Sequence, residues 1–393
     1  MTQQPKTMEF ISRITEALDQ EQILKDLTEN VSGPFDWGVL FVTPWRPYEP
    51  IELYQALAGR VGIKHFFCCT CAGIIGTQRE IEGRPAASLM LARLPGVLVN
   101  PFYLNQVQLE GLGTPEALYN FFEIYPNESP SFLVLPDPFA IDTNRFLKVL
   151  NQAYKGAAII GGLASAASGP QENVLIMDGQ VYQEGLMGVV LSGSIKIEAV
   201  VSQGCRPFGQ TFIVTKAKDN IVYELAGQPF YKVLEAALKA GTDYDRHLAR
   251  EAIFMGIVIN EHQQEFKRGD FLIRPVMAID PATGAGAIGD YVSVGQTVQF
   301  HLRDAKTAHE DLHELLKLQR TKTAQSLKGA LVFSCNGRGL NLFKEFNHDI
   351  RIIQHHLGPV PAAGFFCAGE VGPVGGINFL HGFTNSMALF YAK

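Results

Sequence analysis

The chain has 393 residues, of which 47% are hydrophobic and 18% charged, against about 25% charged in an average soluble protein. Its formal net charge is −6 and it has no basic run that could follow a phosphate backbone, so nucleic acid is excluded as an expected partner. A chain this long exceeds what one hydrophobic core usually supports, which predicts two domains.

The segment after Met1–Lys6 carries apolar residues at helical spacing, among them Ile11, Leu18 and Leu27, between charged ones. This pattern predicts an amphipathic helix that ends before Gly33-Pro34. The segment lacks the apolar core of a signal peptide, and no stretch reaches the ~20 uninterrupted apolar residues that span a bilayer. Because the six cysteines are dispersed, reduced thiols are expected, and we predict a cytoplasmic protein without membrane insertion.

A unit of strand, helix, strand, glycine-rich turn and strand then occurs three times. The three turns are Cys69–Gly73, Gly161–Ser165 and Gly364–Glu370, each preceded by apolar runs. The same interval separates Pro44 from Cys69 and Pro136 from Gly161. Each copy ends in another apolar strand: Ala87–Leu94, Leu186–Leu191 and Ser386–Tyr391. The repeat predicts an α/β fold of two domains built around mixed β-sheets, with the turns gathered at sheet ends.

Between the second and third copies the pattern changes. It predicts strands over Glu198–Leu225, a helix over Pro229–Lys239, a hairpin of Phe271–Ile279 with Tyr291–Leu302, and a helix over Asp304–Gln319. Gly284–Gly289 fits the GxGxxG pattern, but it leads into strand-like residues. A dinucleotide fingerprint needs a strand before it and a helix after it, so we interpret this segment as a hairpin loop.

The third copy concentrates polar residues on tight backbone. Arg338 is suited to clamp a carboxylate, with neighbouring glycine N–H groups forming an anion-binding nest, and Glu370 is suited to hold an amine. A zwitterionic amino acid would satisfy both. The further candidates for ligand binding are Cys335, Asn336, Gly339, Cys367, Gly369 and Arg206. The structural alternatives are a buried ion pair between Arg338 and Glu370 and, for Arg206, a turn at Pro207.

Two enzymatic alternatives remain open. Cys335 or Cys367 could act as a thiol nucleophile, since turn N–H groups lower a thiol pKa, with His381 as the best candidate for a base. A second alternative is a zinc hydrolase, because His309-Glu310-Asp311-Leu312-His313 is an HExxH sequence on a predicted helix. Against these stand the structural interpretations: buried packing cysteines and histidines at the edge of an apolar stripe.

Read in order, these motifs resemble the FIST family, whose halves are described as FIST-N and FIST-C. The resemblance is carried by Cys335–Gly339, Gly364–Gly376, Gln203–Pro207, Arg303-Asp304-Ala305 and Phe379–Gly382. Cys69–Gly73 and Gly161-Gly162 look like N-terminal counterparts, although Ile74 stands where the family often has an acidic residue.

The resemblance implies an N-terminal helix over 1–31, a FIST-N-like domain over 32–226 and a FIST-C-like domain over 227–393. It also implies a sensory or signal-transduction module that binds a small ligand, such as an amino acid. Because the N-terminal segment is too short for a separate output domain, a protein partner is expected to receive the signal. No cofactor, metal or known reaction is implied.

Overall fold

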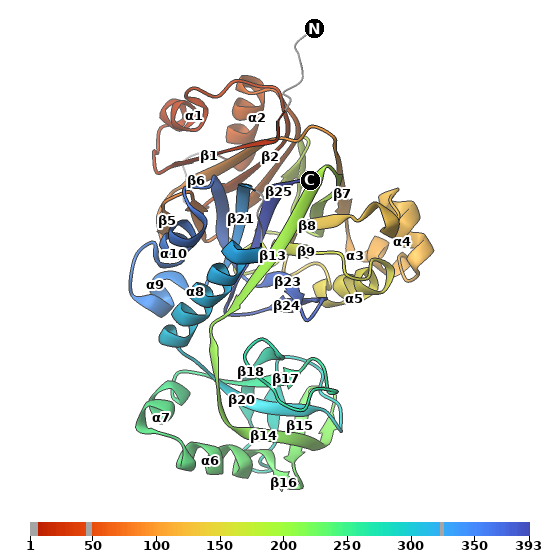
Figure 1. Ribbon diagram of the computed structural model, residues 1–393, viewed down its shortest axis with the longest axis vertical. Coiled ribbons are helices and arrows are strands. Elements are labelled where there is room, and N and C mark those ends of the chain that lie inside the picture. Colours follow the sequence, from red (N-terminus) through yellow and green to blue (C-terminus); the bar gives the residue numbers. More distant parts are fainter. Residues whose placement is uncertain (1–6, 45–48, 323–325) are drawn as a thin grey trace. The chain divides into compact units, whose positions relative to one another are not determined.

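The computed structural model describes residues 7–44, 49–322 and 326–393 (Figure 1). By internal contacts the chain divides into a larger unit, Met1–Ser202 with Leu312–Leu380 and Thr384–Lys393, and a smaller unit, Gln203–Asp311 with His381–Phe383. Helices and mixed sheets confirm the predicted α/β class. Met1–Lys6, where the N-terminal prediction begins, lies outside the described residues.

The larger unit contains the three predicted repeats. The first is β2 (Phe35–Val42), α2 (Pro50–Arg60), β3 (Ile63–Thr70), β4 (Gly73–Gly76), β5 (Glu80–Glu82) and β6 (Ala87–Arg93). The second is β8 (Ser131–Pro136), α5 (Thr143–Ala153), β9 (Ile159–Gly162), β10 (Leu175–Met177), β11 (Gln180–Tyr182) and β12 (Leu186–Gly193). The third is β21 (Leu327–Cys335), α9 (Gly339–Phe343), α10 (His348–Leu357), β22 (Ala362–Cys367), β23 (Glu370–Val374), β24 (Ile377–His381) and β25 (Thr384–Ala392).

Each repeat builds a sheet in the same way. The first strand pairs in parallel with the second and antiparallel with the last, as β2 does with β3 and β6. The strands β8, β9 and β12, and the strands β21, β22 and β25, repeat this arrangement. One more strand extends each sheet beyond its last strand: β1 (Glu9–Thr15), β7 (Val97–Leu104) and β13 (Ile195–Gln203).

The hairpin that follows each glycine-rich turn leaves its own sheet and joins that of another repeat. Strand β4 pairs with β22, β10 pairs with β3, and β23 pairs with β9. The first repeat thus extends the third sheet, the second extends the first, and the third extends the second. This exchange forms a closed ring, so the three sheets are interdependent.

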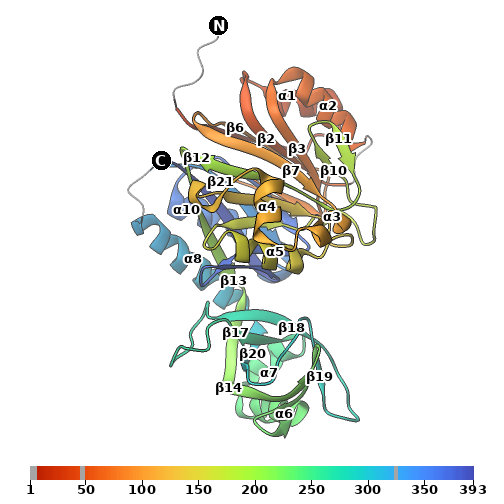
Figure 2. The same cartoon turned by 90° about the vertical axis from the view of Figure 1, so that its right-hand side faces the viewer.

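Helices cover one face of each sheet, and the opposite faces meet in a shared core (Figure 2). Helices α1 (Gln20–Thr28) and α2 pack on the first sheet. Helices α3 (Gln106–Gly111), α4 (Pro115–Phe122) and α5 pack on the second, near the 3-10 turn Pro126–Glu128, and α8 (Ala305–Lys322) and α10 pack on the third. The shared core takes Phe41, Met187 and Phe365 from the three sheets.

The three glycine-rich turns meet, as predicted. Ser165 of the second turn accepts a hydrogen bond from Ala72 N of the first at 3.0 Å and donates its hydroxyl to Phe366 O of the third. Leu163 N donates to Gly369 O at 2.9 Å. The six cysteines, all among the described residues, are buried and form no disulfide.

The prediction of one N-terminal helix is wrong for Glu9–Thr15, which forms strand β1. This segment is rich in β-branched residues and pairs antiparallel with β6, whereas the helix begins only after Asp19, whose side chain caps it by accepting from Gln22 N at 2.9 Å. Leu18, counted in the helical stripe, is 57% exposed between the two elements. The apparent helical spacing therefore joined residues of two different elements.

The smaller unit holds a seven-stranded antiparallel sheet together with helices α6 and α7. Its elements are β14 (Cys205–Lys218), β15 (Ile221–Leu225), β16 (Gln228–Pro229), α6 (Phe230–Ala240), α7 (Asp243–Ala249), β17 (Ile253–Val258), β18 (Phe271–Ile279), β19 (Gly286–Ile288) and β20 (Thr297–Arg303). The expected hairpin partner of β18 is wrong: β18 pairs with β19, while β20 pairs with β17 and β14. Tyr291 is 77% exposed, outside any strand, because turns interrupt the chain there.

In the GxGxxG segment, Gly284 and Ala285 belong to the loop after β18, but Gly286–Ile288 form β19, so the prediction of a hairpin loop holds only for its first part. The described residues that follow it directly form no helix, as the sequence indicates. Among the described helices, none combines the length and the hydrophobicity that a membrane crossing requires.

Candidate ligand-binding site

The turn after β21 is held by a carboxylate from another repeat. Gly339 begins α9 with a φ of +51°, and a Cβ at this position would lie 2.3 Å from Oε1 of Glu82. The same Oε1 accepts a hydrogen bond from Leu340 N at 2.9 Å. The backbone N–H group of Leu340, one residue beyond the glycine that was predicted to help bind an anion, therefore contacts the exchanged hairpin β4–β5.

Arg338 makes its ion pair with Asp349, a residue that the sequence analysis did not single out. Its Nε and Nη2 donate to the two oxygens of Asp349 at 2.8 and 3.0 Å, and the Arg338 side chain is 0% exposed. Burial opposes ionisation of Asp349, but the charge of Arg338 and a hydrogen bond with His348 outweigh it and hold the Asp349 pKa below its usual range. The expected pairing partner, Glu370, is thus not the partner of this bidentate bridge.

Further polar groups close around Asp349. Ser334 Oγ and Asn385 Nδ2 donate to its Oδ2 at 3.3 and 2.9 Å. The ring of Phe343 lies 5.2 Å from the Arg338 guanidinium carbon. A buried ion pair surrounded by hydrogen-bond donors in this way fixes the packing of α9, α10 and β21 against one another.

Glu80 is the second carboxylate that the exchanged hairpin delivers. Its Oε1 accepts from Ile350 N, in the first turn of α10, at 2.7 Å, and its own N–H donates to Asn347 Oδ1 at 2.7 Å. Its Oε2 is buried without a hydrogen-bond partner among the described residues. Burial, with the nearby charge of Asp349, raises the pKa of Glu80 to about 8. Glu80 is therefore largely protonated at neutral pH.

Glu370 lies in the same repeat as Arg338, the third, but in a different polar cluster. Its Oε2 accepts from the backbone and hydroxyl of Thr384 at 3.1 and 2.8 Å. Burial raises its pKa to about 8, although Thr384, a hydrogen bond with Cys335 and the charge of Arg338 all act in the opposite direction. Cys335 also accepts a hydrogen bond from Gly337 N at 3.4 Å.

The remaining predicted site residues are divided between the two units. Asn336 N donates to Cys367 O at 2.9 Å, and Gly369 links the third turn to the second. Cys367 is buried beside Glu370, and burial raises its thiol pKa well above the usual value. Arg206 belongs to the smaller unit, where it pairs with Asp245 and Asp304 at 2.5 and 3.4 Å.

A hollow of about 600 Å³ opens beside the two hairpin carboxylates. It is lined by Arg79, Glu80, Glu82, Arg84, Leu340, Phe346 and Asn347. Arg79 and Arg84 both pair with Glu16, and Phe346 is 59% exposed. Groups of both charge signs and two apolar side chains thus face one space of a size typical for small ligands.

The HExxH sequence does not form a metal site in the described part of the chain, where no group of three His, Cys, Asp or Glu side chains is placed to hold an ion. His313 Nδ1 lies 2.7 Å from His356 Nε2, so these two rings share a hydrogen bond. Glu310 lies 3.9 Å from Lys306 on the same helix. As for the thiols, Cys335 has a hydrogen bond with the carboxyl group of Glu370.

A model of the FIST N domain matches residues 36–228, and a model of the FIST C domain matches residues 231–373. The chain belongs to the FIST family. FIST domains are generally sensory or signal-transduction modules.

The relatives of this FIST protein include two from mycobacteria. Uncharacterized protein Rv0628c of Mycobacterium tuberculosis is 38% identical over 343 residues, 87% of this chain and 88% of the relative. Uncharacterized protein Mb0898c of Mycobacterium bovis is 38% identical over 322 residues, 82% of each chain. Uncharacterized protein MJ1623 of Methanocaldococcus jannaschii is 25% identical over 211 residues, 49% of this chain and 38% of the relative.

Three residues of the site, Glu80, Glu82 and Asp349, were missed by sequence reasoning. Glu80 and Glu82 alternate with the buried Ile81 on a short strand, a pattern that indicates a polar face but not its partner. Asp349 begins an amphipathic helix, where an acidic residue is ordinarily explained by the helix dipole. The one available signal for an acidic partner was Arg338 itself, an arginine on a tight turn that has no acidic residue in the same turn.

Proposed function

We propose that this FIST protein is a sensory module that binds a small ligand carrying an ammonium group, such as an amino acid, and signals through a protein partner. The ligand would occupy the hollow at Glu80 and Glu82. The observation that carries this proposal is Oε2 of Glu80, which is buried without a hydrogen-bond partner among the described residues although its residue lines that hollow. Buried polar atoms usually have partners, and a ligand ammonium group would supply one.

The charges lining the hollow favour a zwitterion. An ammonium group would be attracted to the two carboxylates. Arg79 and Arg84 share the single carboxylate of Glu16, so together they keep a net positive charge for the carboxylate of a ligand. Leu340 and Phe346 offer apolar contact for a side chain. Compared with the sequence-based site at Arg338 and Glu370, this placement leaves the bidentate pair of Arg338 with Asp349 intact.

The two carboxylates also connect the ligand to the rest of the third repeat. Glu80 caps the start of α10 and Glu82 caps the start of α9. A ligand that attracts either carboxylate weakens or redirects a cap, and such caps contribute about 0.5–2 kcal/mol each to helix stability. Ligand occupancy would thereby alter the order of α9 and α10, whose surface a protein partner could read.

The test begins with native mass spectrometry of untreated protein, to identify any co-purified small molecule, followed by calorimetric titration with the twenty amino acids. We expect one or a few to bind, with at least a tenfold loss of affinity in Glu80→Gln and in Glu82→Gln. Glu345→Gln is the matched control, because Glu345 is exposed and pairs with Arg351 outside the hollow. Equal affinity in all three variants would overturn the placement.

Proton release gives a second measurement. Because burial raises the Glu80 pKa to about 8, an ammonium group that binds there at pH 7 must displace most of a proton. Titrations in buffers of different ionisation enthalpy should report this proton in the wild type and not in Glu80→Gln. Hydrogen exchange of α9 and α10 with and without ligand then tests the capping step, and unchanged exchange would remove it.

A further inference from the structure

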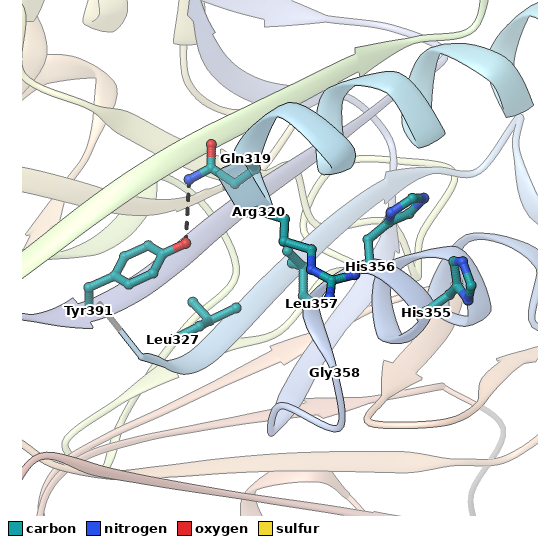
Figure 3. Close-up of a pocket in the computed structure, with 8 residues that line it drawn as sticks. All are labelled: Gln319, Arg320, Leu327, His355, His356, Leu357, Gly358 and Tyr391. Carbon is teal, nitrogen blue, oxygen red and sulfur yellow. Dashed lines mark hydrogen bonds between the residues drawn. The ribbon is translucent and has the colours of Figure 1, made fainter. Parts of the chain in front are cut away.

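A second hollow, of about 310 Å³, lies at the other end of α10. Its lining residues are Gln319, Arg320, Leu327, His355, His356, Leu357, Gly358 and Tyr391. Figure 3 shows Arg320 extending between the pair Gln319–Tyr391 on one side and the two histidines on the other. The lining thus combines three basic side chains, two polar ones and two leucines, and contains no carboxylate.

The basic groups are crowded. Burial lowers the pKa of His356, and the positive charges of His355, Arg320 and Lys317 lower it further. The ring centres of His355 and His356 are 5.0 Å apart, and His313 adds a third imidazole 4.9 Å from that of His356. In this arrangement the cationic forms of the imidazoles repel their neighbours, and a bound anion would relieve that repulsion.

Hydrogen-bond donors are available for such an anion. The ring nitrogens His313 Nδ1 and His356 Nε2 are 2.7 Å apart. When His313 donates in this bond, neutral His356 carries its proton on Nδ1, the nitrogen outside the bond. Tyr391 accepts from Gln319 Nε2 at 3.4 Å, which leaves the phenol proton for another acceptor.

One carboxylate near the hollow, that of Glu198, is already engaged. Gln319 Nε2 also donates to Glu198 on β13, and Glu198 pairs with Lys196 on the same strand. The apolar side chains of Leu327 and Leu357 provide a wall for an organic group. The space therefore suits an anionic head with a small hydrophobic part.

A simpler explanation exists for the basic residues. Arg320 lies in the last turn of α8 and His355 and His356 in the last turn of α10, where helix dipoles favour positive charge. This accounts for one basic residue at each helix end. It does not account for the delivery of three to one hollow, where the charges of His355 and Arg320 act against protonation of His356.

We propose that this hollow binds the phosphoryl group of a small phosphate ester, with Arg320 as the fixed cation and His356 as a hydrogen-bond donor. Arginine is suited to this role because its planar guanidinium donates two parallel hydrogen bonds to phosphate oxygens. The site is distinct from the hollow at Glu80 and Glu82, and it does not depend on the ligand proposed there.

Phosphate titrations of the full chain test the site. Inorganic phosphate and phenyl phosphate are titrated by calorimetry at pH 6 in low salt, against wild type, Arg320→Gln, His356→Gln and Lys317→Gln. We expect at least a tenfold weaker affinity in the first two variants and less than a threefold change in Lys317→Gln, because Lys317 is outside the lining. Glu80→Gln should bind phenyl phosphate as wild type does, which separates this site from the first.

The outcomes distinguish three cases. Phenyl phosphate binding at least fivefold tighter than inorganic phosphate supports an ester. Equal affinity overturns the ester and leaves inorganic phosphate as the ligand. Absence of saturable binding up to ~20 mM, or equal binding by Arg320→Gln and wild type, overturns the site altogether. Thermal unfolding of each variant confirms that the side chain, and not the fold, was changed.

A second set of calorimetric titrations compares binding at pH 6 and pH 8 and uses sulfate, whose charge stays constant between these values. The titratable and charged groups around His356 are His313, Lys317 and Arg320 on α8, His355 on α10, Glu198 on β13 and Tyr391 on β25. Because a bound anion favours the protonated imidazoles, sulfate should bind at least fivefold more weakly at pH 8 than at pH 6. His356→Gln should reduce that ratio, and an unchanged ratio would remove His356 from the site.

Discussion

At its first turn, helix α10 receives the buried carboxylate of Glu80 and contains the buried ion pair partner of Arg338, whereas at its last turn it presents His355 and His356 to an open hollow. Both ends obey the helix dipole, with negative charge at the start and positive charge at the end. They differ in what completes them. The ion pair at the start is completed within the chain by Arg338, while His355 and His356 at the end line the second hollow. The start therefore combines stability with the ligand site proposed at Glu80, whereas the end contributes to recognition alone.

The largest expected effect comes from breaking the start. Arg338→Met keeps a similar volume but leaves Asp349 buried without its cation, which should lower the free energy of unfolding by about 3–5 kcal/mol. Urea unfolding measures the loss. Arg351→Met is the control, because the Arg351–Glu345 pair is exposed and should contribute less than about 1 kcal/mol. A small loss in Arg338→Met would mean that Arg338 is held for a ligand instead.

The exchanged hairpin provides the next effect. Gly339→Ala should destabilise by about 1–3 kcal/mol through strain at positive φ, and further through contact with Glu82. Gly83→Ala has a comparable φ of +65° with open space around the added methyl group, and so isolates the strain. In a double-mutant cycle, Glu82→Ala should recover part of the cost of Gly339→Ala. Additive effects would show that the carboxylate does not fill this turn.

The pH dependence of the free energy of unfolding should further distinguish the first turn of α10, which contacts Glu80, from its last turn. Burial raises the Glu80 pKa from 4.5 to about 8, so between these values the folded state binds more protons than the unfolded state. The contribution of Glu80 to stability is then full below pH 4.5 and is lost as the pH rises through 8, by at most about 1.4 kcal/mol per pH unit. Chemical unfolding of Glu80→Gln from pH 5 to 8 should show a flatter decline than wild type. Identical slopes would contradict the raised pKa.

The smallest effect is expected at the other end. Arg320→Gln removes an exposed cation that lines a hollow, so its free energy of unfolding should stay within about 0.5 kcal/mol of wild type at pH 7. Thermal and urea unfolding both check this. A loss as large as that of Arg338→Met would place Arg320 in the structural network and erase the contrast between the two ends.

The repeat and the meeting of its turns were predictable because both depend on local patterns, namely apolar runs and glycine-rich turns at matching intervals. The exchange of hairpins was not, because pairs such as Ala363 with Gly76 join distant parts of the chain with no local signal. For the same reason Arg338 could be recognised as unusual from the sequence, but its partner Asp349 could not be identified. Nor could Glu82 be identified as the residue that contacts the turn after Arg338. The N-terminal error had another cause, since β1 and α1 together imitate one amphipathic stripe.

The ring of exchanged hairpins sets an order for the synthesis of the chain. Strand β4, which ends at Gly76, finds its sheet partner β22 only when residues up to Cys367 have been made. During translation the first repeat therefore leaves the ribosome while one edge of β4, the edge that later pairs with β22, has no partner strand. This edge stays unpaired until nearly the whole protein has emerged. Chain segments with unpaired strand edges are prone to aggregate, so this stage is the one at which nascent chains would most need a chaperone.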